Sequence, residues 1–192
     1  VQGATDAARA AADIVLTKPG LSTIVTAIIV ARTVFGRMTS FITYRIAATL
    51  QLLIFFFIAV LTMYPRDFQP ESALEEWPAF FHMPVMMLML ITLLNDGTLI
   101  SIGYDNVVPN TTPDKWNLKV LFTIAGVLGG VALLSSLLML WVALNSHNPE
   151  GVWAKAGLAG LTYGQITSMV YLKVSISDFL TLFSSRSGAG FF

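Results

Sequence analysis

Four long apolar runs dominate the pattern of the chain, and short polar segments separate them. A transmembrane helix needs about 20 mostly apolar residues to cross roughly 30 Å of hydrocarbon, and each run is long enough. The second run contains Pro84 and a polar group at 95–98, so we expect its helix to bend or unwind there. The pattern predicts a mainly α, polytopic α-helical membrane protein with four spans, at about residues 40–64, 80–104, 118–144 and 161–183.

The first apolar run continues toward the N-terminus with no helix breaker except Gly36. Arg32 and Arg37 make this upstream part too polar to be a separate span. We therefore expect one helix over about residues 21–64, on the order of 65 Å long at about 1.5 Å per residue. Its first half, residues 21–39, is predicted to be a stalk outside the membrane.

The first twenty residues follow a different pattern. The stretch TDAARAAA predicts a short helix, DIVLT a buried strand, and Lys18-Pro19-Gly20 a turn. This is the pattern of the last helix and strand of an α/β domain. Because twenty residues cannot bury a core alone, we expect the chain to be a piece of a longer protein, with the rest of that domain upstream.

Composition agrees with a membrane protein. The 192 residues are 55% hydrophobic and 11% charged, whereas soluble domains carry about 25% charged residues. A net charge of zero gives no electrostatic footprint for nucleic acid, and two histidines without a cysteine provide no zinc-ligand cluster. Lysine and arginine are concentrated before the first span, between the second and third, and at the C-terminal end, so the positive-inside rule predicts a cytoplasmic N-terminus.

Charges at membrane depth are candidate functional residues because each is costly to insert. Arg45 and Asp96 lie roughly 12 to 13 Å from the cytoplasmic ends of the first two spans, so an ion pair is geometrically reasonable. The alternative is that Arg45 snorkels to the interface and Asp96 is a structural carboxylate. Asn95 and Thr98 add an amide and a hydroxyl beside Asp96, and Gln51 is either a further polar contact or a packing residue.

The number of carboxylates favours a proton over a metal cation. Calcium takes six to eight oxygen ligands, usually with several carboxylates, while the first two spans offer one. Burial favours the protonated form of a carboxyl group, and a neighbouring arginine favours the ionised form. An arginine that moves would therefore switch such a carboxylate between holding and releasing a proton.

Two further features of the spans leave alternatives open. Lys173 and Asp178 are five residues apart, about 140° around a helix, so they do not form a same-face pair. Structural packing and a relay in the cytoplasmic half are both compatible with them. Gly126 and Gly130 have the GxxxG spacing that predicts close helix packing in the third span.

Six segments give a more specific signal: GATDAARAAADIVLTKPGLSTIV, ARTVFGRM, YRIAATLQL, LLNDGT, VVPNTTPDKWNLK and VYLKVSISDFLTLFSSR. In this order and spacing, the chain resembles the P-type plasma-membrane proton ATPases of plants, fungi and algae. The resemblance implies that Asp96 is the membrane carboxylate of proton transport and that Arg45 matches its fungal partner. Plant members place an arginine at the position of Gln51.

The resemblance also implies a domain division and an activity. Residues 1–20 would end the cytoplasmic phosphorylation domain, residues 40–184 would hold spans five to eight of ten, and residues 185–192 would begin a truncated cytoplasmic end. The intact protein would export protons across the plasma membrane, using ATP and Mg²⁺ bound by cytoplasmic domains that this chain lacks.

Because the phosphorylation motif D-K-T-G-T is absent, this chain would hold no catalytic residue. We also expect no metal site in it. The expected partners are the proton, the lipid bilayer and the rest of the same protein, with no nucleic acid. The alternatives are a P-type ATPase for calcium or another cation, and a non-enzymatic four-helix channel or subunit.

Overall fold

The computed structural model describes residues 5–15, 22–71, 73, 76–109, 111–112 and 116–187. These residues contain helices and connecting segments and no strand. The α-helices are α1 (Asp6–Ala10), α2 (Ser22–Thr62), α3 (Val85–Gly103), α4 (Leu118–Leu144), α5 (Val152–Lys155) and α6 (Tyr163–Ser187), and 3-10 turns follow α2 at Pro65–Phe68 and α4 at Asn145–His147. Four of them, α2, α3, α4 and α6, are long and apolar enough to cross a membrane, which confirms the predicted four-span α-helical fold.

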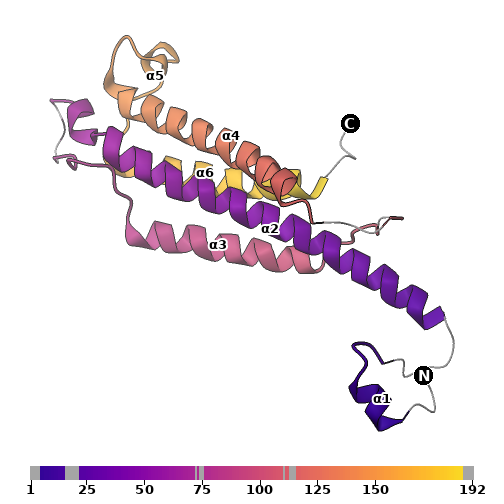
Figure 1. The fold of residues 1–192 in the computed structure, drawn as a ribbon. Coiled ribbons are helices and arrows are strands. Elements are labelled where there is room, and N and C mark those ends of the chain that lie inside the picture. The colour runs from indigo at the N-terminus through magenta and orange to yellow at the C-terminus, as the bar shows by residue number, and fades with distance from the viewer. Residues whose placement is uncertain are drawn as a thin grey trace.

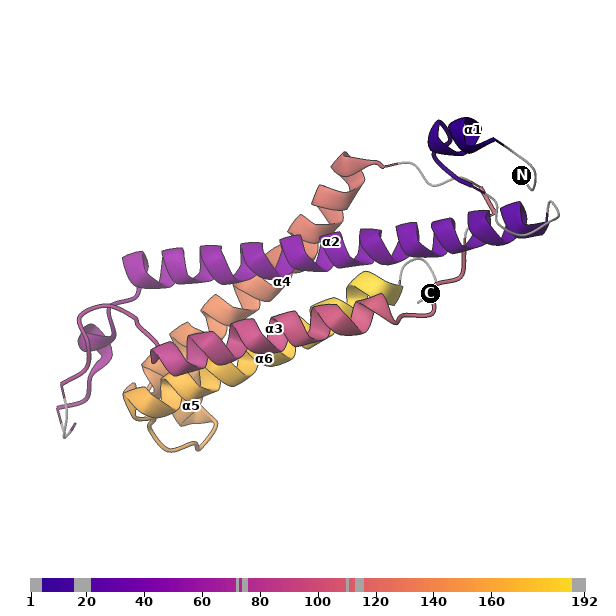
Figure 2. The same ribbon diagram turned by 90° about the horizontal axis from the view of Figure 1, so that it is seen from below.

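The four long helices form an up-and-down bundle in which α2 and α4 run in one direction and α3 and α6 return (Figure 1). The most extensive helix contact is between α2 and α4, and α6 packs against α2, α3 and α4. Figure 2 shows α4 crossing α2 obliquely, with α3 and α6 next to each other along one side of α2. Helix α3 is therefore covered on only one side by the rest of the bundle.

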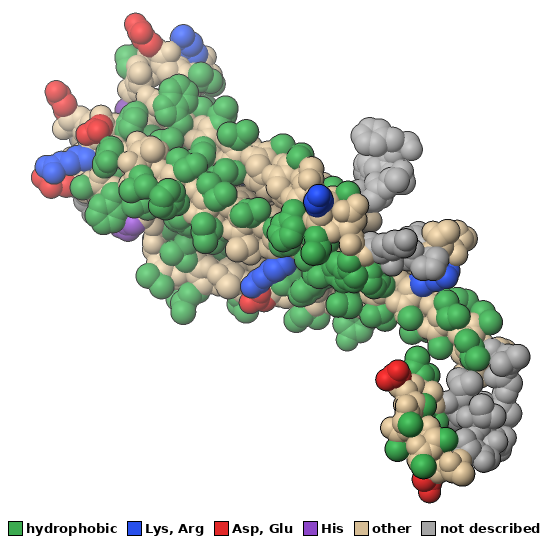
Figure 3. Space-filling model, viewed as in Figure 1, with side chains coloured by type: hydrophobic (Ala, Val, Ile, Leu, Met, Phe, Trp, Pro, Cys, Tyr) green, Lys and Arg blue, Asp and Glu red, His purple; other side chains and the backbone are tan. Residues whose placement is uncertain are grey.

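The outside of the bundle is apolar, as a lipid-facing surface requires. Hydrophobic side chains cover the middle of the molecule, and charged side chains gather at the end where the α2–α3 loop and α5 lie (Figure 3). Large side chains such as Phe57, Leu93 and Leu134 are about two-thirds exposed. Along α3 only Ile91 and Ile102 are buried.

Helix α2 is one continuous element of 41 residues, as the sequence predicts. At about 1.5 Å per residue it is about 60 Å long, twice the thickness of the hydrocarbon core. It ends at Thr62, shortly before Pro65, whose ring fixes the chain for a 3-10 turn. Leu21, where we expected the helix to begin, lies outside the described residues.

Helix α3 differs from the expectation of a bent or unwound span. It is helical throughout from Val85 to Gly103, including residues 95–98, and Pro84 occupies the N-cap position before the helix. A proline at the start of a helix removes no hydrogen bond, because the first N–H groups have no partner within the helix. The Thr98 hydroxyl donates to a carbonyl group one turn earlier, at Leu94 or Asn95. Its hydrogen bond is therefore satisfied within an unbroken helix.

The short N-terminal segment agrees with the prediction only in part. The expected helix is present as α1, capped by the Thr5 hydroxyl, which accepts from the N–H of Ala8. Of the expected strand at 13–17, the structure describes residues 13–15, which have no strand conformation, and Ile14 is 77% exposed. A strand requires a hydrogen-bonded neighbour, and the described residues provide none. The rest of that segment, with the predicted turn at 18–20, lies outside the described residues.

A single glycine sets the close approach of α2 and α4. A Cβ atom built on Gly129 would lie 2.8 Å from the carbonyl oxygen of Ala47. Gly126 and Gly130, the pair with GxxxG spacing, have open space within 4 Å at the same test. Among the described residues, this pair therefore makes no close helix contact, because the face of α4 turned toward α2 carries Gly129 instead.

We expect Gly129→Ala in the intact protein to lower the free energy of unfolding by about 1–3 kcal/mol, the usual cost of overpacking. The matched change Gly126→Ala should be neutral or slightly stabilising, since alanine has the higher helix propensity. Thermal unfolding of both variants in detergent measures this difference, and equal melting temperatures would contradict the proposed contact.

Candidate functional site

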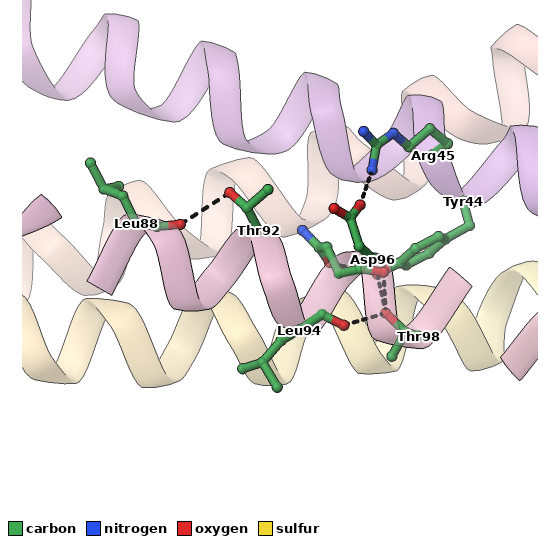
Figure 4. A network of polar contacts seen from close by, with 8 residues as sticks. Tyr44, Arg45, Leu88, Thr92, Leu94, Asp96 and Thr98 are labelled. Atoms are coloured by element: carbon green, nitrogen blue, oxygen red, sulfur yellow. Dashed lines mark hydrogen bonds and ion pairs between the residues drawn. The ribbon is translucent and has the colours of Figure 1, made fainter. Parts of the chain in front are cut away.

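The charged residues of the first two spans meet between α2 and α3. Nη1 of Arg45 donates to Oδ1 of Asp96 at 3.0 Å, and the contact is also an ion pair (Figure 4). Both side chains are about half exposed, at 50% and 56%. The guanidinium of Arg45 thus turns toward a carboxylate on the neighbouring span at its own depth, as the matched spacing allowed.

The adjacent residues form a second, more buried contact. Tyr44 is fully buried, and its hydroxyl donates to Oδ1 of Asn95 at 2.6 Å and lies 3.1 Å from the Thr98 hydroxyl. Two consecutive residues of α2 therefore bind two consecutive residues of α3. Neighbouring positions on a helix point about 100° apart, so the two contacts lie in different directions. Tyr44 and Asn95 face the interior of the bundle, while Arg45 and Asp96 lie at its edge.

An open groove lies beside the ion pair. Its volume is about 420 Å³, and its lining comes from the two spans, with Arg45 and Asn95 as its most polar members and Thr49, Leu52 and Thr92 further along. Of the ion pair, Arg45 lines this groove and Asp96 does not.

Gln51, for which a polar contact and a packing role were both open, lies inside the bundle. It is 1% exposed, and neither its amide nitrogen nor its amide oxygen has a hydrogen-bond partner among the described residues. No hydrogen bond joins it to Arg45 or Asp96 within this part of the chain.

The two charges of α6 point to different neighbours. Lys173 donates to three oxygen atoms of α4, whereas Asp178 is 4% exposed and faces Asn95 on α3 across a small, closed gap. Both carboxylate oxygens of Asp178 lack a well-oriented hydrogen bond among the described residues. This arrangement agrees with the 140° separation predicted from their spacing. Their roles stay open between packing and a relay.

At one end of the bundle, Asp105 connects three helices. Its carboxylate forms a two-point ion pair with Arg186 of α6, and its backbone carbonyl accepts from Nε of Arg37 at 2.7 Å. About one and a half turns nearer the N-terminus of α2, Arg32 donates to the carbonyl of Thr111 at 2.8 Å. The N-terminal half of α2 is thereby attached to the loop that follows α3.

Sequence reasoning identified Arg45, Asp96, Asn95 and Thr98, and the structure brings these four together. It missed Tyr44, which binds two of them. A tyrosine in an apolar helix usually reflects packing, but a buried tyrosine hydroxyl needs a partner, and its position next to Arg45 was the available signal.

Within the described ranges, no group of three or more histidine, cysteine, aspartate or glutamate side chains could hold a metal ion. The polar groups that do converge on the site are one ion pair and one tyrosine–amide–hydroxyl cluster. Such a site can hold, exchange or orient a proton, because carboxylate, amide and hydroxyl groups are all hydrogen-bonding partners.

Fold and site together define a polytopic α-helical membrane protein with paired charges inside its spans. The chain is 56% identical over 196 aligned positions to the probable proton ATPases 1A and 1B of Leishmania donovani, and the alignments cover 100% of this chain and 20% of each relative. No family model matches the chain. The chain spans about a fifth of the length of these curated relatives, and the match along its whole length supports its interpretation as a fragment of a P-type proton ATPase.

We expect Tyr44→Phe to lower the free energy of unfolding of the intact protein by about 1 kcal/mol, since the change removes one buried hydrogen bond and leaves the Asn95 amide oxygen without its donor. Tyr104→Phe is the matched control, because Tyr104 is 86% exposed. Unfolding in detergent, followed by tryptophan fluorescence, measures both variants. Equal stability of the two would show that the Tyr44 hydroxyl contributes nothing.

Proposed function

We propose that this chain is the proton-conducting part of an ATP-driven proton pump of the plasma membrane. The observation that carries the proposal is the Arg45–Asp96 ion pair between two adjacent spans, beside an open groove. A carboxylate at membrane depth is costly and is a natural proton acceptor. The similarity of the whole chain to probable proton ATPases also supports the proton as the transported ion.

We further propose a division of labour along the chain. Residues 1–20 end the cytoplasmic phosphorylation domain, residues 21–39 are a stalk, residues 40–184 lie in or at the membrane, and residues 185–192 return to the cytoplasm. ATP and Mg²⁺ bind to domains outside this chain, and hydrolysis there proceeds through an aspartyl phosphate. The N-terminus is cytoplasmic, which the arginine and lysine distribution supports.

Helix α2 is the element that transmits the motion. It carries Tyr44 and Arg45 and extends far beyond the thickness of the bilayer. A tilt or rotation of its outer half would move the Arg45 guanidinium relative to Asp96. With the guanidinium close, a carboxylate prefers the ionised form, and with it distant and water excluded, the protonated form. Alternating between these arrangements binds a proton on one side and releases it on the other.

Contacts at the cytoplasmic end support this coupling. Arg37 and Arg32 bind backbone carbonyl groups of the loop after α3, so a displacement of the stalk also pulls on the helix that carries Asp96. The alternatives have less support. A calcium site needs several carboxylates, and Asp96 has one basic partner instead. A separate four-helix channel would not account for a match to one fifth of the proton ATPases.

The direct test is Asp96→Asn in the intact protein. We expect ATP-driven acidification of sealed vesicles to fall by roughly tenfold or more, because the amide cannot exchange a proton. Formation of the phosphorylated enzyme from ATP serves as the folding control. Asp67→Asn, in the exposed turn after α2, should leave transport unchanged. Normal acidification by Asp96→Asn would refute the proposed role of the carboxylate.

A further inference from the structure

Lys173 is a cation in the middle of a membrane span. It follows Tyr163 by ten residues and precedes Arg186 by thirteen, which places it about 15 Å and about 20 Å from the ends of that span. A lysine near a helix end extends its ammonium group to the interface, but this residue is too deep for its four-carbon stem to do so. Its charge must be accommodated inside the bundle.

Three oxygen atoms of α4 surround the ammonium group. Nζ lies 2.9 Å from the carbonyl oxygen of Ala132, 2.6 Å from the hydroxyl of Ser135 and 2.5 Å from the hydroxyl of Ser136. The three residues lie near the middle of α4, at the depth expected for Lys173. An ammonium group has three N–H donors, so the number of acceptors equals the number of donors.

The two hydroxyl groups are oriented to receive a cation. Each can donate its proton to the carbonyl of Ala132, which lies 2.9 Å from the Ser135 hydroxyl and 2.8 Å from that of Ser136. A hydroxyl that has donated its only proton can offer only lone pairs to another neighbour. The three oxygens therefore form a purely electron-donating set, of the kind that carbonyl and hydroxyl groups provide for alkali-metal cations in membrane proteins.

Among the described residues, no acid lies within ion-pair distance of Lys173. The ion pairs within 4.0 Å in the described part of the chain involve other residues. Asp178, on the same helix, acts on Lys173 as a more distant negative charge and faces Asn95 of α3. A lysine kept for helix packing alone would be less costly as methionine or leucine, because a charge in hydrocarbon is expensive unless it is paired. The ligand set thus accepts a positive charge, and the chain itself supplies that charge.

We infer that Lys173 is a tethered cation that occupies a monovalent-cation site on α4, and that without it this site would take a potassium or ammonium ion. By filling the site, Lys173 keeps mobile alkali cations out of the membrane domain, so it is a specificity-determining residue. The occupancy of the site stands on the contacts above. Its consequence, a pump that moves only protons, rests on the proposed function.

The test uses Lys173→Ala in the intact protein, purified in detergent. Its melting temperature is compared in choline chloride, potassium chloride and ammonium chloride at equal ionic strength. We expect potassium or ammonium to raise the melting temperature of the variant by about 3 °C or more over choline, with no such difference for the unchanged protein. A variant that folds only when potassium or ammonium is present supports the proposal equally.

The same melting temperature in all three salts overturns the proposal, as does a variant that folds in none of them, because a mobile cation would then not replace the tethered one. Lys155→Ala, in the exposed α5, is the matched control and should show no specific salt effect. Lys173→Arg keeps the charge and should not respond either. Adding Ser136→Ala to Lys173→Ala should remove the gained response, since it deletes one of the three oxygens.

This experiment is independent of proton transport. The salt effect on unfolding needs no ATP and no intact Asp96. If Lys173→Ala shows the expected salt response and Asp96→Asn transports protons fully, only the proposed function is refuted. If Lys173→Ala shows no salt response and Asp96→Asn loses transport as expected, only the tethered cation is refuted.

Discussion

A polar side chain inside a bilayer must find its partner within the protein, because hydrocarbon offers no hydrogen bonds. This constraint accounts for most of the specific contacts between the four spans. Arg45 and Tyr44 of α2 bind Asp96 and Asn95 of α3, and Lys173 of α6 binds three oxygens of α4. Apolar packing brings the helices together without selecting a rotation about their axes. The polar pairs select that rotation, so they align the helices as well as furnish the chemistry.

The length of α2 connects the site to the rest of the protein. A helix of 41 residues exceeds what the membrane requires, and its outer half is attached by Arg32 and Arg37 to the loop that follows α3. Close packing of α2 on α4 at Gly129 provides a firm support in the membrane. A helix that is held in the middle and is longer than the membrane is thick is suited to carry a motion from outside the membrane to a side chain at membrane depth.

The site is asymmetric in its burial, and this asymmetry suits a proton path. Tyr44 is fully buried and Asn95 is half-buried, while the side chains of Arg45 and Asp96 are about half exposed, and Arg45 lines the open groove. Beyond Asn95, the buried Asp178 has no well-oriented hydrogen bond among the described residues. Asn95 thus faces one carboxylate, that of Asp178, and its neighbour in the chain, Asp96, has an arginine partner.

The sequence by itself determined the four spans, the long first helix and the equal depths of Arg45 and Asp96, because run length, helix breakers and rise per residue are properties of the chain alone. It also determined that Lys173 and Asp178 face different directions. Only the tertiary structure decided which residues meet. The contacts of Gly129, Tyr44 and Lys173 depend on the rotation of each helix about its axis, and in an all-apolar span hydrophobic periodicity does not specify this rotation, since lipid and protein accept the same side chains.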